Sequence, residues 1–212
     1  GWKAFTSCGI TRVDISDLTT WYNIKFGHEA NPLYSYDANP LHCGAKLYLN
    51  GNLVTDLIIP DNVTSIGDNV FYGCSSLESV TIPDSVTSIG MGAFQDCSNL
   101  ASVTIPDSVT SIGMGAFSSD NLEVTINTDD KYLYSEDGTT ILLCDSSVTN
   151  VVIPENVTTI QDDAFYYCRN IETFVTGDTL TLLPYIPKGS LKSITIGNSV
   201  TSIGDQSFMN CS

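Results

Sequence analysis

Apolar residues recur along the chain at fixed spacings that predict short, stacked β-strands. In residues 77–99, Leu77, Val80 and Ile82 are apolar, and Val80 and Ile82 alternate with polar neighbours as the inward positions of a strand do. Pro83 follows and ends the strand, because proline has no amide hydrogen to donate to a neighbouring strand. The pattern therefore predicts one short strand per repeat, with one face buried.

The second half of the same segment predicts the return of the chain. Val86 and Ile89 are spaced as inward residues of a second extended segment, and Gly90 permits a turn. We expect Ala93 and Phe94 to close the repeat in a short 3₁₀ turn before Cys97.

The pattern repeats through most of the chain. Its phenylalanines are separated by 23, 23, 48 and 43 residues, so each of the last two intervals contains one further, degenerate repeat; they are Phe71, Phe94, Phe117, Phe165 and Phe208. One unit cannot bury its apolar side chains alone, whereas stacked units bury them in a continuous core. The sequence therefore predicts a β-rich solenoid.

The repeat L-x-x-V-x-I-P-x-x-V-x-x-I-G-x-x-A-F-x-x-C resembles the consensus of BspA-like leucine-rich repeats, which are found in bacterial surface proteins. The resemblance implies a right-handed leucine-rich-repeat superhelix with a parallel sheet. It also implies surface display and adhesion. We expect residues 1–212 to form a single solenoid domain, with irregular insertions at about 16–52 and 127–147.

The first insertion contains signals for a helix and for a hairpin. Ser16 or Asp17 is suited to cap a short helix that runs through Trp21 to Phe26. The sequence LYLNGNLV, centred on Asn50–Gly51, predicts a hairpin with a two-residue type I′ turn.

The second insertion predicts another hairpin, which contains Tyr132, Tyr134 and Asp137–Gly138. Insertions in repeat arrays lie on one face and often bind ligands. We expect these tyrosines, with Tyr34 and Tyr36 of the first insertion, to be exposed contact residues, since tyrosine is favoured at interfaces.

Five of the seven cysteines occupy one position of the repeat: Cys8, Cys74, Cys97, Cys168 and Cys211. Such a column favours buried thiols that pack like small apolar side chains, and we expect them to be free thiols. Cys43 and Cys144 lie outside this column, and the sequence is compatible with an exposed or a half-buried position for each.

Charge and motifs exclude several functions. The net charge of −16 repels nucleic acid and anionic lipid, and no apolar run of about 18 residues is present to cross a membrane. His28 and His42, with Glu29 and Cys43 nearby, lack any known metal-ligand or nucleophile spacing. We therefore expect no enzymatic activity, no cofactor and no metal.

The outward strand positions are the remaining candidates for binding. They form an approximate column of mostly β-branched residues, which strand propensity alone also explains: Asp14, Ile58, Thr81, Thr104, Thr125, Val152, Val175 and Thr195. With flanking charges and the hairpin tyrosines, the candidate ligand contacts are Arg12, Glu78, Thr81, Thr104, Tyr132, Tyr134 and Lys192.

The sequence therefore predicts an extracellular, non-enzymatic binding or adhesion module that contacts a host or bacterial surface protein or a glycan. The alternative is a structural spacer that presents another domain. Both ends of the chain fall within the repeat pattern, so we expect a fragment of a longer array. End-on self-association of such a fragment would be an artefact of truncation.

Overall fold

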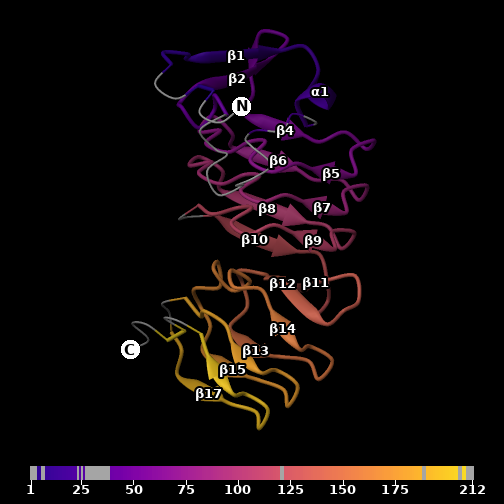
Figure 1. The fold of residues 1–212 in the computed structure, drawn as a ribbon, viewed down its shortest axis with the longest axis vertical. Coiled ribbons are helices and arrows are strands. Elements are labelled where there is room, and N and C mark those ends of the chain that lie inside the picture. Colours follow the sequence, from indigo (N-terminus) through magenta and orange to yellow (C-terminus); the bar gives the residue numbers. More distant parts are fainter. Residues whose placement is uncertain are drawn as a thin grey trace. The chain divides into compact units, whose positions relative to one another are not determined.

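The computed structural model describes residues 4–5, 8–22, 24, 26, 39–119, 122–187, 190–204 and 207–208. They form two compact units, Gly1–Leu122 (unit 1) and Glu123–Ser212 (unit 2). Each unit is built from short strands and tight turns, and one short helix is present among the described residues (Figure 1). That residues 1–212 form a single domain stays a prediction.

The first side of unit 1 consists of β4 (Asp56–Ile58), β6 (Ser79–Thr81) and β8 (Ser102–Ile105). β4 and β6 pair in parallel, with Asp56 opposite Ser79 and Ile58 opposite Thr81, and β8 lies against β6. The middle residue Val80 is buried while its neighbours on the strand are exposed, as the alternation predicts.

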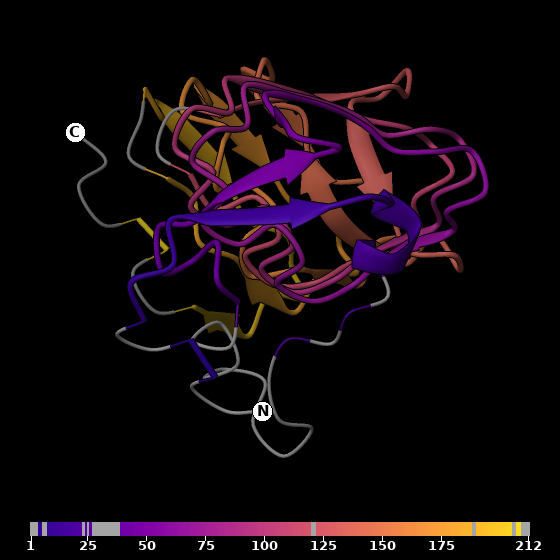
Figure 2. The same ribbon diagram turned by 90° about the horizontal axis from the view of Figure 1, so that it is seen from above.

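The second side of unit 1 is a parallel sheet of β5 (Ser65–Ile66), β7 (Ser88–Ile89) and β9 (Ser111–Ile112), in this order. The proline after each first-side strand begins a tight turn into this side: the amide of Val86 donates to the carbonyl of Pro83 at 3.1 Å. Successive turns of the chain follow nearly the same path when unit 1 is seen from above (Figure 2).

The third side is a stack of turns that are closed by single i→i−3 hydrogen bonds, as in the expected 3₁₀ turn, but they do not continue into a 3₁₀ helix. Alternate amides donate to the next repeat, as Phe71 does to Ala93 at 2.8 Å and Phe94 does to Ala116 at 2.6 Å. The amides between them donate within the repeat, as Ala93 does to Gly90 at 3.3 Å. A 3₁₀ helix would direct all these donors along its own axis, so bonding between repeats prevents it from forming.

The phenylalanines form the centre of the unit 1 core. Phe71 and Phe94 stack with ring centroids 5.2 Å apart, and Phe94 and Phe117 stack at 5.3 Å with planes only 4° apart. All three side chains are buried. The stacking register predicted from the repeat is therefore confirmed.

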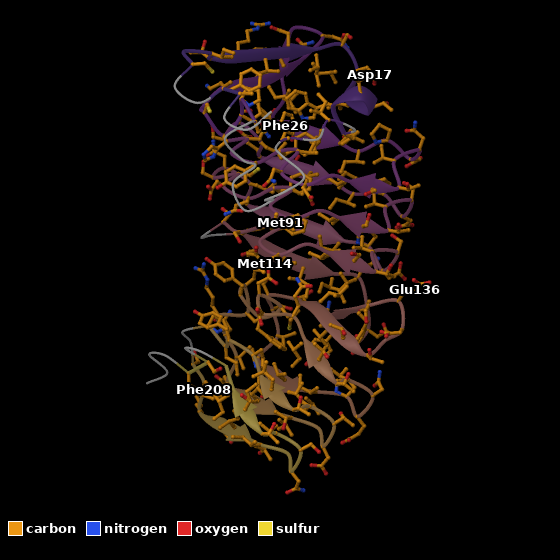
Figure 3. All side chains as sticks on the ribbon, viewed as in Figure 1. Asp17, Phe26, Met91, Met114, Glu136 and Phe208 are labelled. Atoms are coloured by element: carbon orange, nitrogen blue, oxygen red, sulfur yellow. The ribbon has the colours of Figure 1, made fainter. Side chains whose placement is uncertain are left out.

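The first insertion contributes β1 (Arg12–Ile15), α1 (Leu18–Tyr22), β2 (Lys46–Leu49) and β3 (Asn52–Leu53). Asp17 lies at the start of α1 (Figure 3) and its carboxylate accepts the Thr19 amide at 2.8 Å, so Asp17 is the N-cap. The helix ends at Tyr22, short of the expected Phe26.

β2 pairs in parallel with β1 and returns through a hairpin into β3. Asn50 and Gly51 have φ of 51° and 82°, which is the pair of positive values that a type I′ turn requires. This hairpin is confirmed.

Buried polar contacts attach the insertion to the repeats. The fully buried Asn39 donates to the carbonyl of Asn69 at 2.6 Å, and the Trp21 indole donates to the carbonyl of Val70 at 3.1 Å. Both acceptors are backbone carbonyls of the adjacent turn, so buried hydrogen bonds attach the insertion to the repeats.

Unit 2 has the same plan. Its strands are β10 (Glu123–Ile126), β11 (Tyr132–Tyr134), β12 (Thr140–Cys144), β13 (Asn150–Val152), β14 (Thr159–Ile160), β15 (Thr173–Val175), β16 (Leu182–Leu183), β17 (Ser193–Thr195) and β18 (Ser202–Ile203). β13, β15 and β17 form one parallel sheet, and β16 pairs in parallel with β18. β11 and β12 form the expected second hairpin, and β12 also pairs in parallel with β14.

The unit 2 core is centred on Phe165, which packs edge-on against Phe174 and Tyr132 at centroid distances of 5.3 and 6.5 Å. Tyr132 is only 5% exposed, so the prediction that it is an exposed contact residue is wrong. The cause is its position opposite Cys144 in the hairpin, on the face that covers the core.

In the last described turn of unit 2, one inward strand position is exposed. Ile203 is 56% exposed, whereas its strand partner Leu183 is fully buried. End-on self-association stays a prediction.

The cysteine column is confirmed where the structure describes its interior: Cys74, Cys97 and Cys168 are buried free thiols. Cys8 is half-buried, and Cys211 lies outside the described residues. Cys144 was placed outside the column, but it is fully buried and its carbonyl accepts the Cys168 thiol at 3.6 Å. The degenerate repeat hides this cysteine in the sequence, because a hairpin replaces the usual turn before it.

Candidate binding surface

The outward face of the first side of unit 1 carries an aliphatic and hydroxyl column. Ile58 is 70% exposed, and its strand partner Thr81 and the equivalent Thr104 of β8 are exposed as well. Burial of a branched aliphatic side chain is worth roughly 1.5–3 kcal/mol, so Ile58 offers a partner more contact energy than the threonines do.

A polar column runs beside it. The Ser79 hydroxyl donates to the Asp56 carboxylate at 2.6 Å, and Thr55 donates to the same carboxylate at 3.0 Å. These bonds, that from Ser79 first, lower the pKa of Asp56. Asp56 is therefore held as a fixed anion.

Arg12 occupies the outward face of β1 in a fixed arrangement. Its guanidinium donates two bonds to Asp14, at 2.6 and 2.8 Å, and lies 3.8 Å from the centroid of the Tyr48 ring. The hydrogen bond from Arg12 lowers the pKa of Asp14. The pair is half-exposed and contributes little to stability, but it orients the guanidinium.

Glu78, another predicted contact, is exposed at the start of β6, and its backbone amide donates to the carbonyl of Thr55 at 2.7 Å. Glu78, Thr81 and Thr104 therefore share the first side of unit 1. Arg12 belongs to the separate β1–β2–β3 sheet.

Unit 2 presents a similar face on β13, β15 and β17. Val152 is 60% exposed, and Val175 and Thr195 follow it across the sheet. The predicted contact Lys192 lies at the edge of this face and pairs with Glu172 at 2.9 Å.

The hairpin of unit 2 is less available than predicted. Besides Tyr132, Tyr134 is half-buried, packs on the core and donates its hydroxyl to Asp130 at 2.6 Å. The exposed part of the hairpin is its tip, which carries Glu136 (Figure 3). Tyr34 and Tyr36 lie outside the described residues.

Ionisable groups in the described residues have structural roles. Asp145 is buried, but its carboxylate accepts the amides of Ile126 and Ser147, each at 2.9 Å. Burial opposes ionisation, yet the bonds from Ser147 and Ile126 leave the pKa of Asp145 below its usual value. Among the described residues no group of three His, Cys, Asp or Glu side chains is placed to hold a metal ion.

Of the group His28, Glu29, His42 and Cys43, the structure describes only His42 and Cys43. His42 packs edge-on against Tyr72 with centroids 4.6 Å apart, whereas His28 and Glu29 lie outside the described residues. In the segments that the structure describes, no helix is long and apolar enough to cross a membrane.

The sequence missed Lys46 and Tyr48 as candidates. Both lie on the outward face of β2, opposite Arg12 and Asp14. The alternation of KLYL was the available signal, since buried Leu47 makes Lys46 and Tyr48 point outward.

Strands stacked in parallel, tight turns between them and a ladder of buried phenylalanines define a leucine-rich-repeat β-solenoid. The chain belongs to the BspA-type leucine-rich-repeat family: it matches the description "BspA type Leucine rich repeat region" in six copies, over residues 43–172 and 185–212. No curated protein matches the chain.

Two solved structures illustrate the likeness. A leucine-rich cell surface protein from Faecalibacterium prausnitzii is 28% identical with a TM-score of 0.50, over 76% of this chain and 52% of that protein. The pneumococcal vaccine antigen PcpA is 20% identical with a TM-score of 0.53, over 74% of this chain and 46% of that protein, and shows similarity of fold alone. The chain thus spans about half the length of these two proteins.

Proposed function

We propose that this chain is a non-enzymatic binding module of a bacterial surface or secreted protein, and that it adheres to a protein or glycan through its outward strand faces. The family supports a binding or structural role, and leucine-rich-repeat solenoids are generally not catalytic. The similar protein from Faecalibacterium prausnitzii is described as a cell surface protein, which supports an extracellular location.

The observation that carries the proposal is the exposure of Ile58 and Val152, at 70% and 60%, on strand faces where threonine occupies several of the equivalent outward positions. A strand position needs only a β-branched side chain, and threonine meets this need at Thr81, Thr104 and Thr195. Isoleucine and valine on a solvated face offer a partner apolar contact area that threonine does not.

The alternative function is a spacer that presents another domain. Its support is the hydroxyl cover of the same faces, which includes Ser65 and Ser88, bonded to each other at 2.8 Å, and Thr173 bonded to Asn150 at 2.8 Å. Such a cover keeps a solenoid soluble without a ligand.

Binding of the protein to arrays of immobilised extracellular proteins and glycans distinguishes the two functions. We expect the wild type to bind a small set of targets, and Ile58→Thr or Val152→Thr to weaken that binding about three- to tenfold through lost apolar contact. Each substitution copies the threonine at equivalent strand positions, so the fold is kept.

Thr104→Val is the matched control, because it changes the same column in the opposite direction and should not weaken binding. Wild-type protein that binds no target, at concentrations at which it remains folded and monomeric, would support the spacer and contradict the binding module.

A further inference from the structure

The β1–β2–β3 sheet of unit 1 places two cations side by side on its outward face. Arg12 is the parallel partner of Lys46, and in the next row Asp14, Tyr48 and Leu53 lie opposite one another. Neighbouring strands are about 4.8 Å apart, so the two cationic side chains can reach one and the same anionic group.

Lys46 is the cation of this pair whose charge is available to a ligand. Two other described cations, Lys131 and Lys192, pair with Asp145 and Glu172 at 3.6 and 2.9 Å. Lys46 is exposed and makes no ion pair with any residue that the structure describes. An ammonium group directed at solvent beside a second cation is a site for a carboxylate.

Arg12 is the pre-oriented half. The bidentate bond to Asp14 and the contact with the Tyr48 ring fix its guanidinium, so a ligand does not need to order it. Asp14 neutralises one of the two positive charges, which leaves a net charge of about +1 in this cluster. The complement is therefore a single carboxylate and not a dense polyanion, which the protein's net charge of −16 would repel.

Apolar area adjoins the charges. Leu53 is 37% exposed and lies directly opposite the half-exposed Tyr48. Arg12 lies over the Tyr48 ring, where a sugar would need to stack. Arginine, tyrosine and aliphatic side chains around one salt-bridging position are the composition of a protein–protein contact.

We propose that the outward face of β1, β2 and β3 docks a protein segment in which one Asp or Glu carboxylate, flanked by aliphatic side chains, pairs with Lys46 and Arg12 while its neighbours cover Tyr48 and Leu53. This partner class rests on the proposed binding function and makes it specific.

The test selects a random 12-residue peptide library displayed on phage against the whole protein, and then measures affinities of the selected synthetic peptides by fluorescence anisotropy. We expect enrichment of one acidic residue next to Val, Leu or Ile. Lys46→Ala should weaken the selected peptides about tenfold, and Leu53→Ser should weaken them several-fold.

Arg169→Ala is the matched control, because it removes one positive charge from an exposed turn of unit 2 and should leave affinity unchanged. Lys46→Gln should lose binding, and Lys46→Arg, which keeps the positive charge, should retain it. Residue 46 is exposed, so neither substitution is expected to disturb folding. Replacing the selected Glu by Gln in the peptide should weaken wild-type binding at least as much as Lys46→Ala does. The same peptide change should cost less in the Lys46→Ala variant, where only Arg12 remains to pair with the carboxylate.

Enrichment without an acidic residue, or affinity insensitive to Lys46→Ala, would overturn the proposal. Tighter binding of polygalacturonate than of any peptide would also overturn it, in favour of an acidic glycan, and concentration-dependent dimerisation that Lys46→Ala abolishes would favour a second copy. In each case, array binding that depends on Ile58 or Val152 still supports the general binding function, so the two proposals fail separately.

Discussion

The stacked phenylalanines determine how much each repeat contributes to stability. Phe94 is fully buried between Phe71 and Phe117, with rings 5.2 and 5.3 Å away. We expect Phe94→Ala to lower the free energy of unfolding by about 3–5 kcal/mol, because a rigid stack cannot collapse into the cavity. Urea denaturation measures this, and a loss below about 1 kcal/mol would contradict the stacked core.

The buried thiols give a prediction for pH. Burial raises the pKa of Cys74, and raises that of Cys97 further, so both thiols stay protonated in the folded state at pH values where an unfolded thiol ionises. We expect stability to be intact below about pH 8.5 and to fall as pH rises above it, since only the unfolded chain releases these protons.

Reaction with Ellman's reagent checks the same point at constant pH. Cys74 and Cys97 should react only after unfolding, and the half-buried Cys8 and Cys43 should react before them. A Cys74–Cys97 disulfide found by mass spectrometry would contradict the prediction of free thiols.

At the scale of single residues, the sequence predicts the burial and the register of those residues that recur in every repeat. Phe94 and Cys97 are identified by their recurrence, whereas Tyr132 and Cys144 are misplaced because the degenerate repeat offers no register against which to align them. Arg12 is predicted as a contact, but its stacking on Tyr48 depends on a strand pairing between residues 34 apart, counted from Asp14 to Tyr48.

The turns between strands depend on close approach of the backbone, which gives a prediction at the scale of the element. A Cβ at Gly113 would lie 2.2 Å from the amide nitrogen of Met91 in the preceding repeat, and Met91 and Met114 lie on adjacent turns (Figure 3). We expect Gly113→Ala to destabilise unit 1 by about 1–3 kcal/mol, because a backbone atom cannot move aside as a side chain can.

Gly9→Ala is the control for this change, since a Cβ there meets no atom within 4 Å. Thermal unfolding followed by circular dichroism compares the two variants. Equal melting temperatures would show that the repeats are spaced more loosely than the structure has them.

Local chemistry explains which elements the sequence predicts. Asn50–Gly51 specifies its hairpin because both residues accept positive φ, and Asp17 specifies the start of α1. The end of α1 at Tyr22 was not predicted correctly, and the expected 3₁₀ turn is limited to single i→i−3 bonds because the amides between them bond the neighbouring repeat. The hydrogen bond from Phe94 to Ala116 belongs to the neighbouring repeat, which no local pattern reveals.

For the whole molecule, we expect stability to be independent of metal ions. The stacked core buries its apolar side chains by repetition, and its buried carboxylate, Asp145, is satisfied by backbone amides and Ser147. Melting in the presence and absence of EDTA tests this prediction. A decrease of many degrees with EDTA would indicate a structural metal site, because bound metal contributes directly to the free energy of folding.

The net charge gives the last prediction. With 24 acidic and 8 basic residues, carboxylates repel one another over the whole surface at neutral pH. This repulsion is stronger in the compact folded state than in the expanded unfolded chain, so it lowers the free energy of unfolding. Salt shortens the range of this repulsion to about 8 Å at 0.15 M, while exposed ion pairs such as Lys192–Glu172 contribute too little to reverse the effect.

We therefore expect the melting temperature at pH 7 to rise between 10 and 150 mM sodium chloride. Lys46→Ala should lower it at low salt and not at high salt, since the substitution removes a cation that partly offsets the repulsion. A melting temperature that falls as salt is added would mean that the ion pairs outweigh the repulsion.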